Sequence, residues 1–167
     1  VAASDAQQQD TYFIVAHIHY VLFGGALMGI FAGIYFWYPK MTGKMYNEGL
    51  GKVQFWSMLI AQNITFFPMH FTGLDGMPRR IYTYQENMGW EFWSLISTIG
   101  SLMLAASMLL FVYNFVNSWR NGEKASGDPW DARTLEWSIS SPPPEYNFAV
   151  IPEITDRDEW WEEKQRR

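Results

Sequence analysis

The chain has 167 residues, of which 49% are hydrophobic and 18% aromatic, and its formal net charge at pH 7 is −5. The negative charge argues against nucleic acid as a partner. Because there is no cysteine, disulfides, thiolate ligands, iron–sulfur clusters and Cys-based copper sites are excluded, and any metal chemistry must use histidine and carboxylates. The charged residues concentrate in the last third, which divides a membrane-like region, residues 1–119, from a polar tail, residues 120–167.

Three apolar segments lie in the first region, at about residues 11–38, 53–71 and 92–116. Each is close to the length that crosses a hydrocarbon core of about 30 Å at a rise of about 1.5 Å per residue. Pro68 predicts a kink or a frayed end in the second segment. We therefore expect an all-α membrane protein with three transmembrane helices and an irregular tail.

The first segment carries His17 and His19 near its start. Residues two apart on an α-helix point about 200° apart around its axis, so these imidazoles cannot share one metal. One helix can instead offer an imidazole to each of two centres, which suggests two haems flanking it. The alternative is that both histidines pack in a core or interface, although intramembrane polar side chains usually mark function. Further along, Gly25, Gly29 and Gly33 have a small-residue spacing that favours close approach of another helix.

The loop charges orient the predicted helices. Basic residues follow the first segment and the third, on what must be the same side of the membrane, namely Lys40, Lys44, Lys52, Arg120 and Lys124. The positive-inside rule assigns that side to the cytoplasm. The start of the chain and the loop at about residues 72–90 then face outward, and the tail is cytoplasmic.

Arg79 and Arg80 lie in the outward loop, where the positive-inside rule does not favour them. Adjacent guanidinium groups bind carboxylates through forked, charge-assisted hydrogen bonds. A haem held by a histidine in the outer third of the membrane would direct its propionates toward this pair. The alternative is a local salt bridge, for which Asp75 and Glu86 are the nearby acids, or contact with lipid headgroups.

Residues 10–20, 63–80 and 128–148 together resemble subunit I of the haem–copper oxidases, in particular the bacterial aa3-type cytochrome c oxidases and the closely related quinol oxidases. The third stretch is similar to the cytoplasmic extension of bacterial members, which implies a bacterial plasma membrane. The resemblance further implies that the three segments are the last three of the family's twelve helices. The chain is then expected to be a C-terminal portion of subunit I, either a split chain or a processed piece.

The resemblance also implies the roles of the site residues. His17 would be the axial ligand of the high-spin haem, haem a3 or a related type, and His19 an axial ligand of the low-spin haem, haem a or a related type. Arg79 and Arg80 would hold haem propionates. Their positive charges would raise the reduction potential by stabilising the added electron.

Asp10 matches a carboxylate that the family uses near a magnesium ion, between the propionates and subunit II. Many members have histidine immediately before this aspartate, whereas this chain has Gln9. The amide of glutamine is a weaker metal ligand than imidazole, so a magnesium ion here would have to be held through Gln9 or water.

The implied function is reduction of O₂ to water by cytochrome c, coupled to proton translocation. The chain has only three histidines, so the copper ion must be held by residues outside it, and the fragment is not active alone. The expected partners are the N-terminal part of subunit I, subunits II and III, cytochrome c and membrane lipid. A quinol oxidase shares nearly every motif and stays open as an alternative. The other alternative is a non-catalytic membrane subunit, which would show no haem spectrum.

Overall fold

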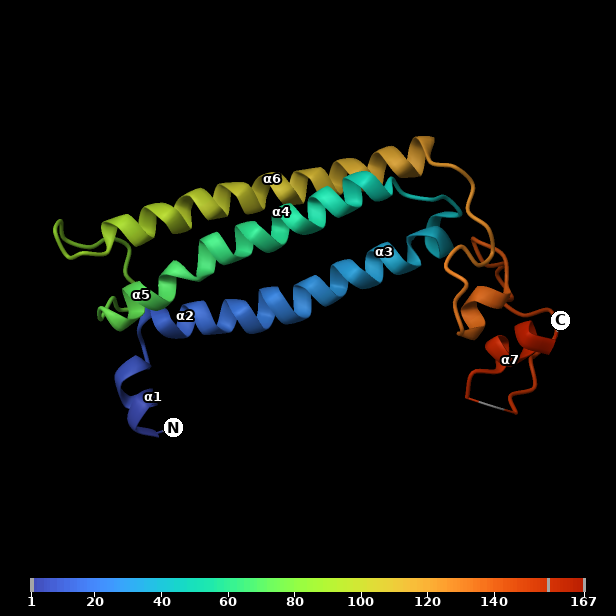
Figure 1. Cartoon of the computed structure of the whole chain (residues 1–167), viewed down its shortest axis with the longest axis horizontal. Coiled ribbons are helices and arrows are strands. Elements are labelled where there is room, and N and C mark those ends of the chain that lie inside the picture. Colours follow the sequence, from blue (N-terminus) through green and yellow to red (C-terminus); the bar gives the residue numbers. More distant parts are fainter. Residues whose placement is uncertain (1, 156, 167) are drawn as a thin grey trace. The chain divides into compact units, whose positions relative to one another are not determined.

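The computed structural model describes residues 2–155 and 157–166, and this part of the chain is helical without strands. It forms two compact units, which we describe separately. The first comprises the described residues up to Phe31 together with Gly49–Val112, and the second comprises Ala32–Glu48 with the described residues from Tyr113 onward. The helices, labelled in part in Figure 1, are α1 (Ala2–Gln8), α2 (Tyr12–His19), η1 (Tyr20–Leu27), α3 (Met28–Thr42), α4 (Glu48–Phe66), α5 (Pro68–Leu74), α6 (Glu91–Asn121), η2 (Leu135–Ser138) and α7 (Glu159–Arg166).

The first predicted segment is a continuous run of α2, η1 and α3, in which η1 is a π-helix. Thr11 caps its start, because the hydroxyl accepts a hydrogen bond from the Phe13 amide at 3.2 Å. The run passes the predicted end at residue 38 and stops at Thr42. Gly43 ends it with φ of 70°, a left-handed conformation typical of helix C-termini, and its amide donates to the Pro39 carbonyl at 2.8 Å.

The second predicted segment is divided between α4 and α5. α4 ends at Phe66 and α5 begins at Pro68, a position where the missing amide hydrogen costs nothing. The break predicted from Pro68 is therefore confirmed. In the first unit α5 packs on α2, as Figure 1 shows, and a side chain at Gly73 would collide with the backbone of Phe13. Only glycine permits this approach.

The third predicted segment is α6, which extends the expected range of residues 92–116 at both ends. In the first unit it packs closely on α4, since a Cβ at Gly100 would lie 2.5 Å from the Thr65 amide nitrogen. The buried apolar side chains of this unit form one cluster, which consists of Phe31, Met58, Ala61, Phe66 and Leu104. This cluster lies between α4 and its neighbours.

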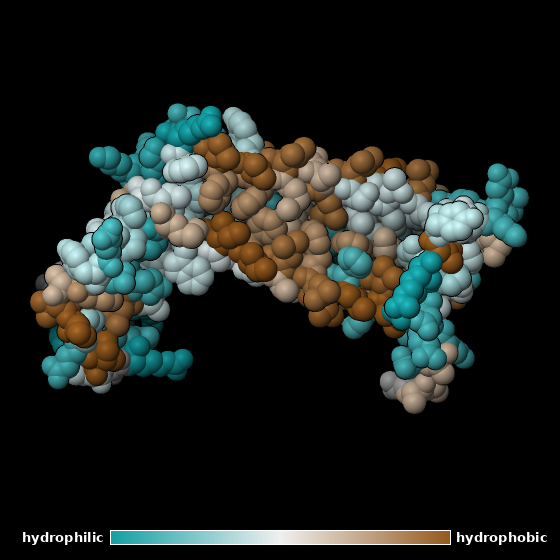
Figure 2. Space-filling model, turned by 180° about the vertical axis from the view of Figure 1, so that it is seen from behind, coloured by the Kyte–Doolittle hydropathy of each residue, from teal (hydrophilic) through white to brown (hydrophobic). Residues whose placement is uncertain are grey.

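Two helical runs are long and apolar enough to cross a membrane, namely Tyr12–Thr42 and Glu91–Asn121. On the face drawn in Figure 2, apolar side chains cover much of the helical surface. The run that includes α4 is less apolar because it carries glutamines, but Gln54 and Gln62 are turned inward, with exposures of 1% and 3%. These two amides therefore do not face the outer surface of the first unit.

The tail forms most of the second unit, where it is irregular apart from η2 and α7. Trp137 of η2 is 1% exposed and packs edge-on against Phe36, with ring centroids 5.1 Å apart. Lys40, which was expected in a loop, lies inside α3 and is buried, and its ammonium donates to the carbonyls of Gly127 at 3.0 Å and Ile139 at 2.8 Å. The part of the tail that contains η2 therefore folds around a residue of α3.

Candidate functional site

His19 is the last residue of α2, and its ring is held on two sides. Its Nδ1 lies 2.7 Å from the carbonyl oxygen of Val15, one turn earlier. Since a carbonyl only accepts, Nδ1 must carry the hydrogen, and in the neutral ring this leaves the Nε2 lone pair free to bind a metal. The ring stacks on Phe66 of α4, with centroids 4.3 Å and planes 18° apart. These contacts give the orientation and tautomer that metal-binding histidines usually receive from their neighbours.

His17 lies two residues earlier on α2 and is exposed. The helix is regular α from Tyr12 to His19, so the two imidazoles leave it on opposite sides, as the sequence predicts. Across the described residues, no group of three or more histidines and acids is arranged to hold a metal ion. The arrangement on α2 offers single imidazoles to two separate centres instead.

Asp10 and Arg79 are brought together by a short pairing of two segments. The amide of Tyr12 donates to the Met77 carbonyl at 3.0 Å, and the amide of Arg79 donates to the Asp10 carbonyl at 2.9 Å. The side chains also form an ion pair, in which the Arg79 Nε lies 2.8 Å from Asp10 Oδ1. The local salt bridge that the sequence left open therefore exists, but its acid is Asp10 in place of Asp75 or Glu86.

Arg79 keeps binding capacity despite this ion pair. Only its Nε and one terminal nitrogen contact Asp10 Oδ1, so the other donors of the guanidinium remain for a second carboxylate. Arg80 is exposed beside it, with φ of 65°. A left-handed backbone conformation is uncommon for a residue other than glycine. It shows that the backbone bends at Arg80 and does not continue there as a helix or strand. The pair thus fits an anionic group such as a propionate.

The magnesium ion predicted at Asp10 stays a prediction. Its carboxylate would have to serve both the ion and Arg79, and the neighbouring Gln9 is exposed and offers only an amide. Magnesium demands several oxygen ligands in octahedral geometry. The described residues here supply few of them.

His70 of α5 packs among aromatic rings. Its ring meets Phe13 edge-on at 5.0 Å and Tyr20 at 5.6 Å, and its Nδ1 lies 3.2 Å from the Phe67 carbonyl. These contacts support a packing role for His70.

Sequence reasoning missed the π-helix and Gln62. The π-helix begins directly after His19, and the side chain of Gln62 contacts it at Gly24. The small-residue spacing pointed to Gly25 and Gly29, but apart from the neighbouring backbone of their own helix, neither has an atom of the described chain within 4 Å of where a Cβ would lie. The only sequence signal for this contact was the pair of adjacent glycines at positions 24 and 25. That Gln62 would be the residue packed against them could not be predicted from spacing.

A cavity of about 360 Å³ lies in the first unit, where α4, α5 and α6 approach Tyr12 and Tyr84. Eight of its ten lining residues carry hydroxyl groups and the other two are methionines. A polar, roomy cavity of this kind can hold ordered water. Neither His17 nor His19 lines it.

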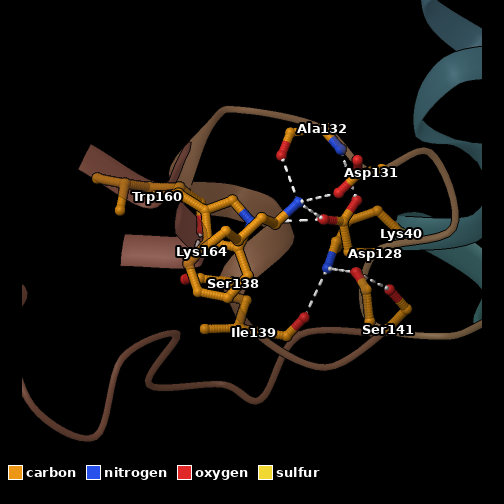
Figure 3. A network of polar contacts seen from close by, with 11 residues as sticks. Lys40, Asp128, Asp131, Ala132, Ser138, Ile139, Ser141, Trp160 and Lys164 are labelled. Atoms are coloured by element: carbon orange, nitrogen blue, oxygen red, sulfur yellow. Dashed lines mark hydrogen bonds and ion pairs between the residues drawn. The ribbon is translucent and has the colours of Figure 1, made fainter. Parts of the chain in front are cut away.

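In the second unit, Lys164 of α7 connects the end of the tail to residues 128–132 near its start (Figure 3). Its ammonium pairs with Asp128 and donates to Asp131 Oδ1 at 2.9 Å and to the Ala132 carbonyl at 2.8 Å. Burial alone would raise the pKa of Asp128, but hydrogen bonds from Lys164, the Ala132 amide and Trp160 hold that pKa below its usual value. Burial would lower the pKa of Lys164, and its two carboxylate partners raise it above the usual value.

Comparison with known proteins places these features in a family. Residues 1–103 match the family described as Cytochrome C and Quinol oxidase polypeptide I. The chain belongs to this family. The matched range of this chain includes His17, His19, Arg79 and Arg80, and it covers α2, α4, α5 and most of the first unit.

Polypeptide I relatives of both kinds are similar over nearly the whole chain. Cytochrome c oxidase subunit 1 of Bacillus sp. (strain PS3) is 51% identical over 164 residues, which cover 98% of this chain and 27% of the relative. Quinol oxidase subunit 1 of Bacillus subtilis (strain 168) is 48% identical over 170 residues, which cover 100% of this chain and 26% of the relative. The chain thus spans about a quarter of the length of these relatives.

Proposed function

We propose that the chain is the C-terminal part of subunit I of a bacterial terminal oxidase, and that it ligates two haems in the reduction of O₂ to water coupled to proton translocation. The observation that carries this proposal is the geometry of α2. His17 and His19 leave it on opposite sides, and the Nδ1 contact of His19 with Val15 leaves Nε2 open for iron. Family membership supports the same assignment.

Each site residue has a distinct task in this proposal. His17 binds the high-spin haem and His19 the low-spin haem, and the short peptide between them fixes the distance and orientation of the two centres. The bound haems supply the iron that carries electrons and binds oxygen. Arg79 and Arg80 hold the propionates, and their charge favours the reduced state. Copper is held by residues outside this chain.

The electron donor is proposed to be cytochrome c, and a quinol is the alternative. Identities of 51% to a cytochrome c oxidase subunit and 48% to a quinol oxidase subunit do not separate the two. Oxygen consumption by the purified complex, measured with reduced cytochrome c and then with a quinol, decides between them.

We further propose three membrane crossings, with α4 and α5 together as the middle one. The chain start and the loop with Arg79 and Arg80 lie outside, and the tail lies in the cytoplasm with basic residues near it. Lys44 and Lys124 pair through their backbones in the second unit, which supports placing the two basic loops on one side. The remaining part of subunit I, subunits II and III and lipid would cover the exposed apolar surface.

The haem assignment is tested by reduced-minus-oxidised spectra of the purified complex. We expect His19→Ala to remove the low-spin haem band, and His17→Ala to abolish carbon monoxide binding at the high-spin haem. His70→Ala is the control, because this histidine packs among aromatic rings and should leave both bands in place. A complex without any haem spectrum would support a non-catalytic membrane subunit instead.

The magnesium proposal at Asp10 has its own measurement. Cells grown with manganese would incorporate Mn²⁺ at such a site, and its electron paramagnetic resonance signal would disappear in Asp10→Ala. A complex that binds no manganese in the unmodified chain would remove the ion from the proposed set without affecting the haem ligands.

A further inference from the structure

The π-helix η1 sets the rotation of the histidine pair relative to the rest of its helix. A π-helix bonds residue i to i+5, so it holds about one more residue per turn than an α-helix. An inserted residue changes the angle between side chains before and after it by about 100° around the axis. η1 occupies Tyr20–Leu27 and begins directly after His19. The directions of His17 and His19 relative to Met28 and beyond therefore depend on η1.

Helix α4 contacts this part of the chain at three levels. Phe66 stacks on His19 at 4.3 Å, and Asn63 accepts a hydrogen bond from the Tyr20 hydroxyl at 2.7 Å. One residue earlier, Gln62 reaches η1 at Gly24, where a Cβ would lie 2.6 Å from the Gln62 Nε2. A Cβ at this position therefore requires the carboxamide, the far end of a flexible side chain, to move away from η1.

Gln62 makes the fold less stable than an apolar side chain of similar size would. It is 3% exposed, and its Oε1 has no hydrogen-bond partner among the described residues. A buried acceptor without a partner costs free energy that an apolar side chain of similar size would avoid. Gly24 also disfavours a helix relative to alanine. Gly24 and Gln62 therefore each lower the stability of the fold, and they contact each other at η1, directly after the two proposed haem ligands.

We propose that Gly24 and Gln62 are positioning residues, whose contact holds η1 in its π-helical form and thereby fixes the orientation of His17 and His19 toward their haems. This inference rests on the proposed function, because it assigns the two imidazoles to haem iron. Gln62 touches neither haem ligand and acts through the backbone of η1.

The test uses four variants of the whole oxidase complex. Gly24→Ala places a Cβ against the carboxamide, and Gly25→Ala is its matched control, because nothing lies within 4 Å of a Cβ there. Both changes have the same effect on intrinsic helix propensity. Gln62→Ala removes the contact from the other side, and the double variant Gly24→Ala with Gln62→Ala removes the collision. The readouts are haem content per complex and the low-spin haem's optical band and electron paramagnetic resonance g-values.

We expect Gly24→Ala and Gln62→Ala to shift the low-spin signature at unchanged haem content. The double variant should shift it as Gln62→Ala does and no further, because both lack the contact and neither has the collision. Gly25→Ala should show no shift. Equal shifts in Gly24→Ala and Gly25→Ala would overturn the proposal, because propensity alone would then explain them. Should Gly24→Ala fail to assemble, an unshifted signature in Gln62→Ala would overturn it as well. Absence of haem from the unmodified complex would instead contradict the proposed function.

Discussion

The imidazole of His19 lies face to face with the ring of Phe66, with centroids 4.3 Å and planes 18° apart. Phe66 belongs to α4 and is 8% exposed, so its ring is held in place by its neighbours and packs against the imidazole. Together with the Nδ1 contact at Val15, the Phe66 ring restricts the rotation of the imidazole, whose Nε2 is the proposed iron ligand. The packing of α4 is therefore linked directly to the proposed ligand.

Phe66→Leu should weaken this restraint while the complex still assembles. The substitution keeps the side chain apolar and costs about 1 kcal/mol of stability, whereas alanine would leave a large cavity. We expect a broadened low-spin haem band and lower low-spin haem occupancy, measured by optical spectra per mole of complex. Phe67→Leu is the matched control, because Phe67 is 54% exposed and its ring contacts are with His70 and Phe71. An effect of equal size in both variants would contradict the proposed role of Phe66 in orienting His19.

The ion pair between Asp10 and Arg79 predicts a signed change in redox potential. Asp10→Asn removes a negative charge next to an arginine that favours the reduced haem, so the low-spin midpoint potential should rise. Arg79→Gln should lower it. We expect changes on the order of 50 mV, close to a tenfold change in a one-electron equilibrium. Stability should change little, since an exposed ion pair is worth about 0–1 kcal/mol.

Redox titration of the complex measures both changes. Asp75→Asn is the control, because this exposed acid lies in the same loop region and forms no ion pair within the described chain. Shifts of the same sign in Asp10→Asn and Arg79→Gln would show that local structure, and not charge, controls the potential.

The helices and the opposed histidines were predictable because they follow from local periodicity. An apolar run of sufficient length predicts a helix, Pro68 predicts the break before α5, and a two-residue spacing places His17 and His19 on opposite sides. None of these conclusions requires knowledge of a distant residue.

The rest depends on contacts between residues far apart in the sequence. Asp10 and Arg79 are separated by 69 positions. From the sequence we expected a magnesium ion at Asp10 and a haem propionate at Arg79, and their contact with each other was not predicted. Lys40 was read as a loop charge, but it is buried by carbonyls of residues 87 to 100 positions away. The π-helix leaves no mark on the apolar pattern, since eight consecutive apolar or glycine residues fit any helix.

Lys40 should be essential for folding of the tail in the second unit. Its ammonium donates to the carbonyls of Gly127, Ile139 and Ser140 at 3.0, 2.8 and 3.3 Å and lies 5.0 Å from the Trp137 ring centroid. Lys40→Met would leave these carbonyls without their donor, at a cost of about 1–3 kcal/mol for each one that stays buried. We expect rapid proteolysis of the tail in the assembled complex. Lys44→Met is the control, because Lys44 donates to one exposed carbonyl, that of Arg120, and its loss should leave the cleavage rate within about twofold.

The ion pair of Asp128 and Lys164 predicts a pH window for the order of the tail. The pKa of Asp128 is lowered in the folded chain, so its contribution is complete above the ordinary value of about 4 and is lost as pH falls through the lowered pKa. The pKa of Lys164 is raised, so its contribution is complete below about 10.4 and is lost as pH rises through the raised pKa. Hydrogen exchange of residues 128–140, corrected for the intrinsic pH dependence, should therefore be constant between about pH 5 and 9.

Lys164→Met separates this window from general acid unfolding. Without the ammonium, Asp128 loses its main stabilising partner and its folded-state pKa moves up, so the part of the tail's stability that is lost on acidification should become smaller. We expect exchange in the same residues to be roughly tenfold faster at pH 7, which corresponds to about 1.4 kcal/mol. Lys124→Met is the control, because this lysine is exposed and is not among the groups that shift the pKa of Asp128 or Lys164. If both variants behave alike, the tail is ordered by burial of Trp137 and Lys40, and the Asp128 pair adds nothing measurable.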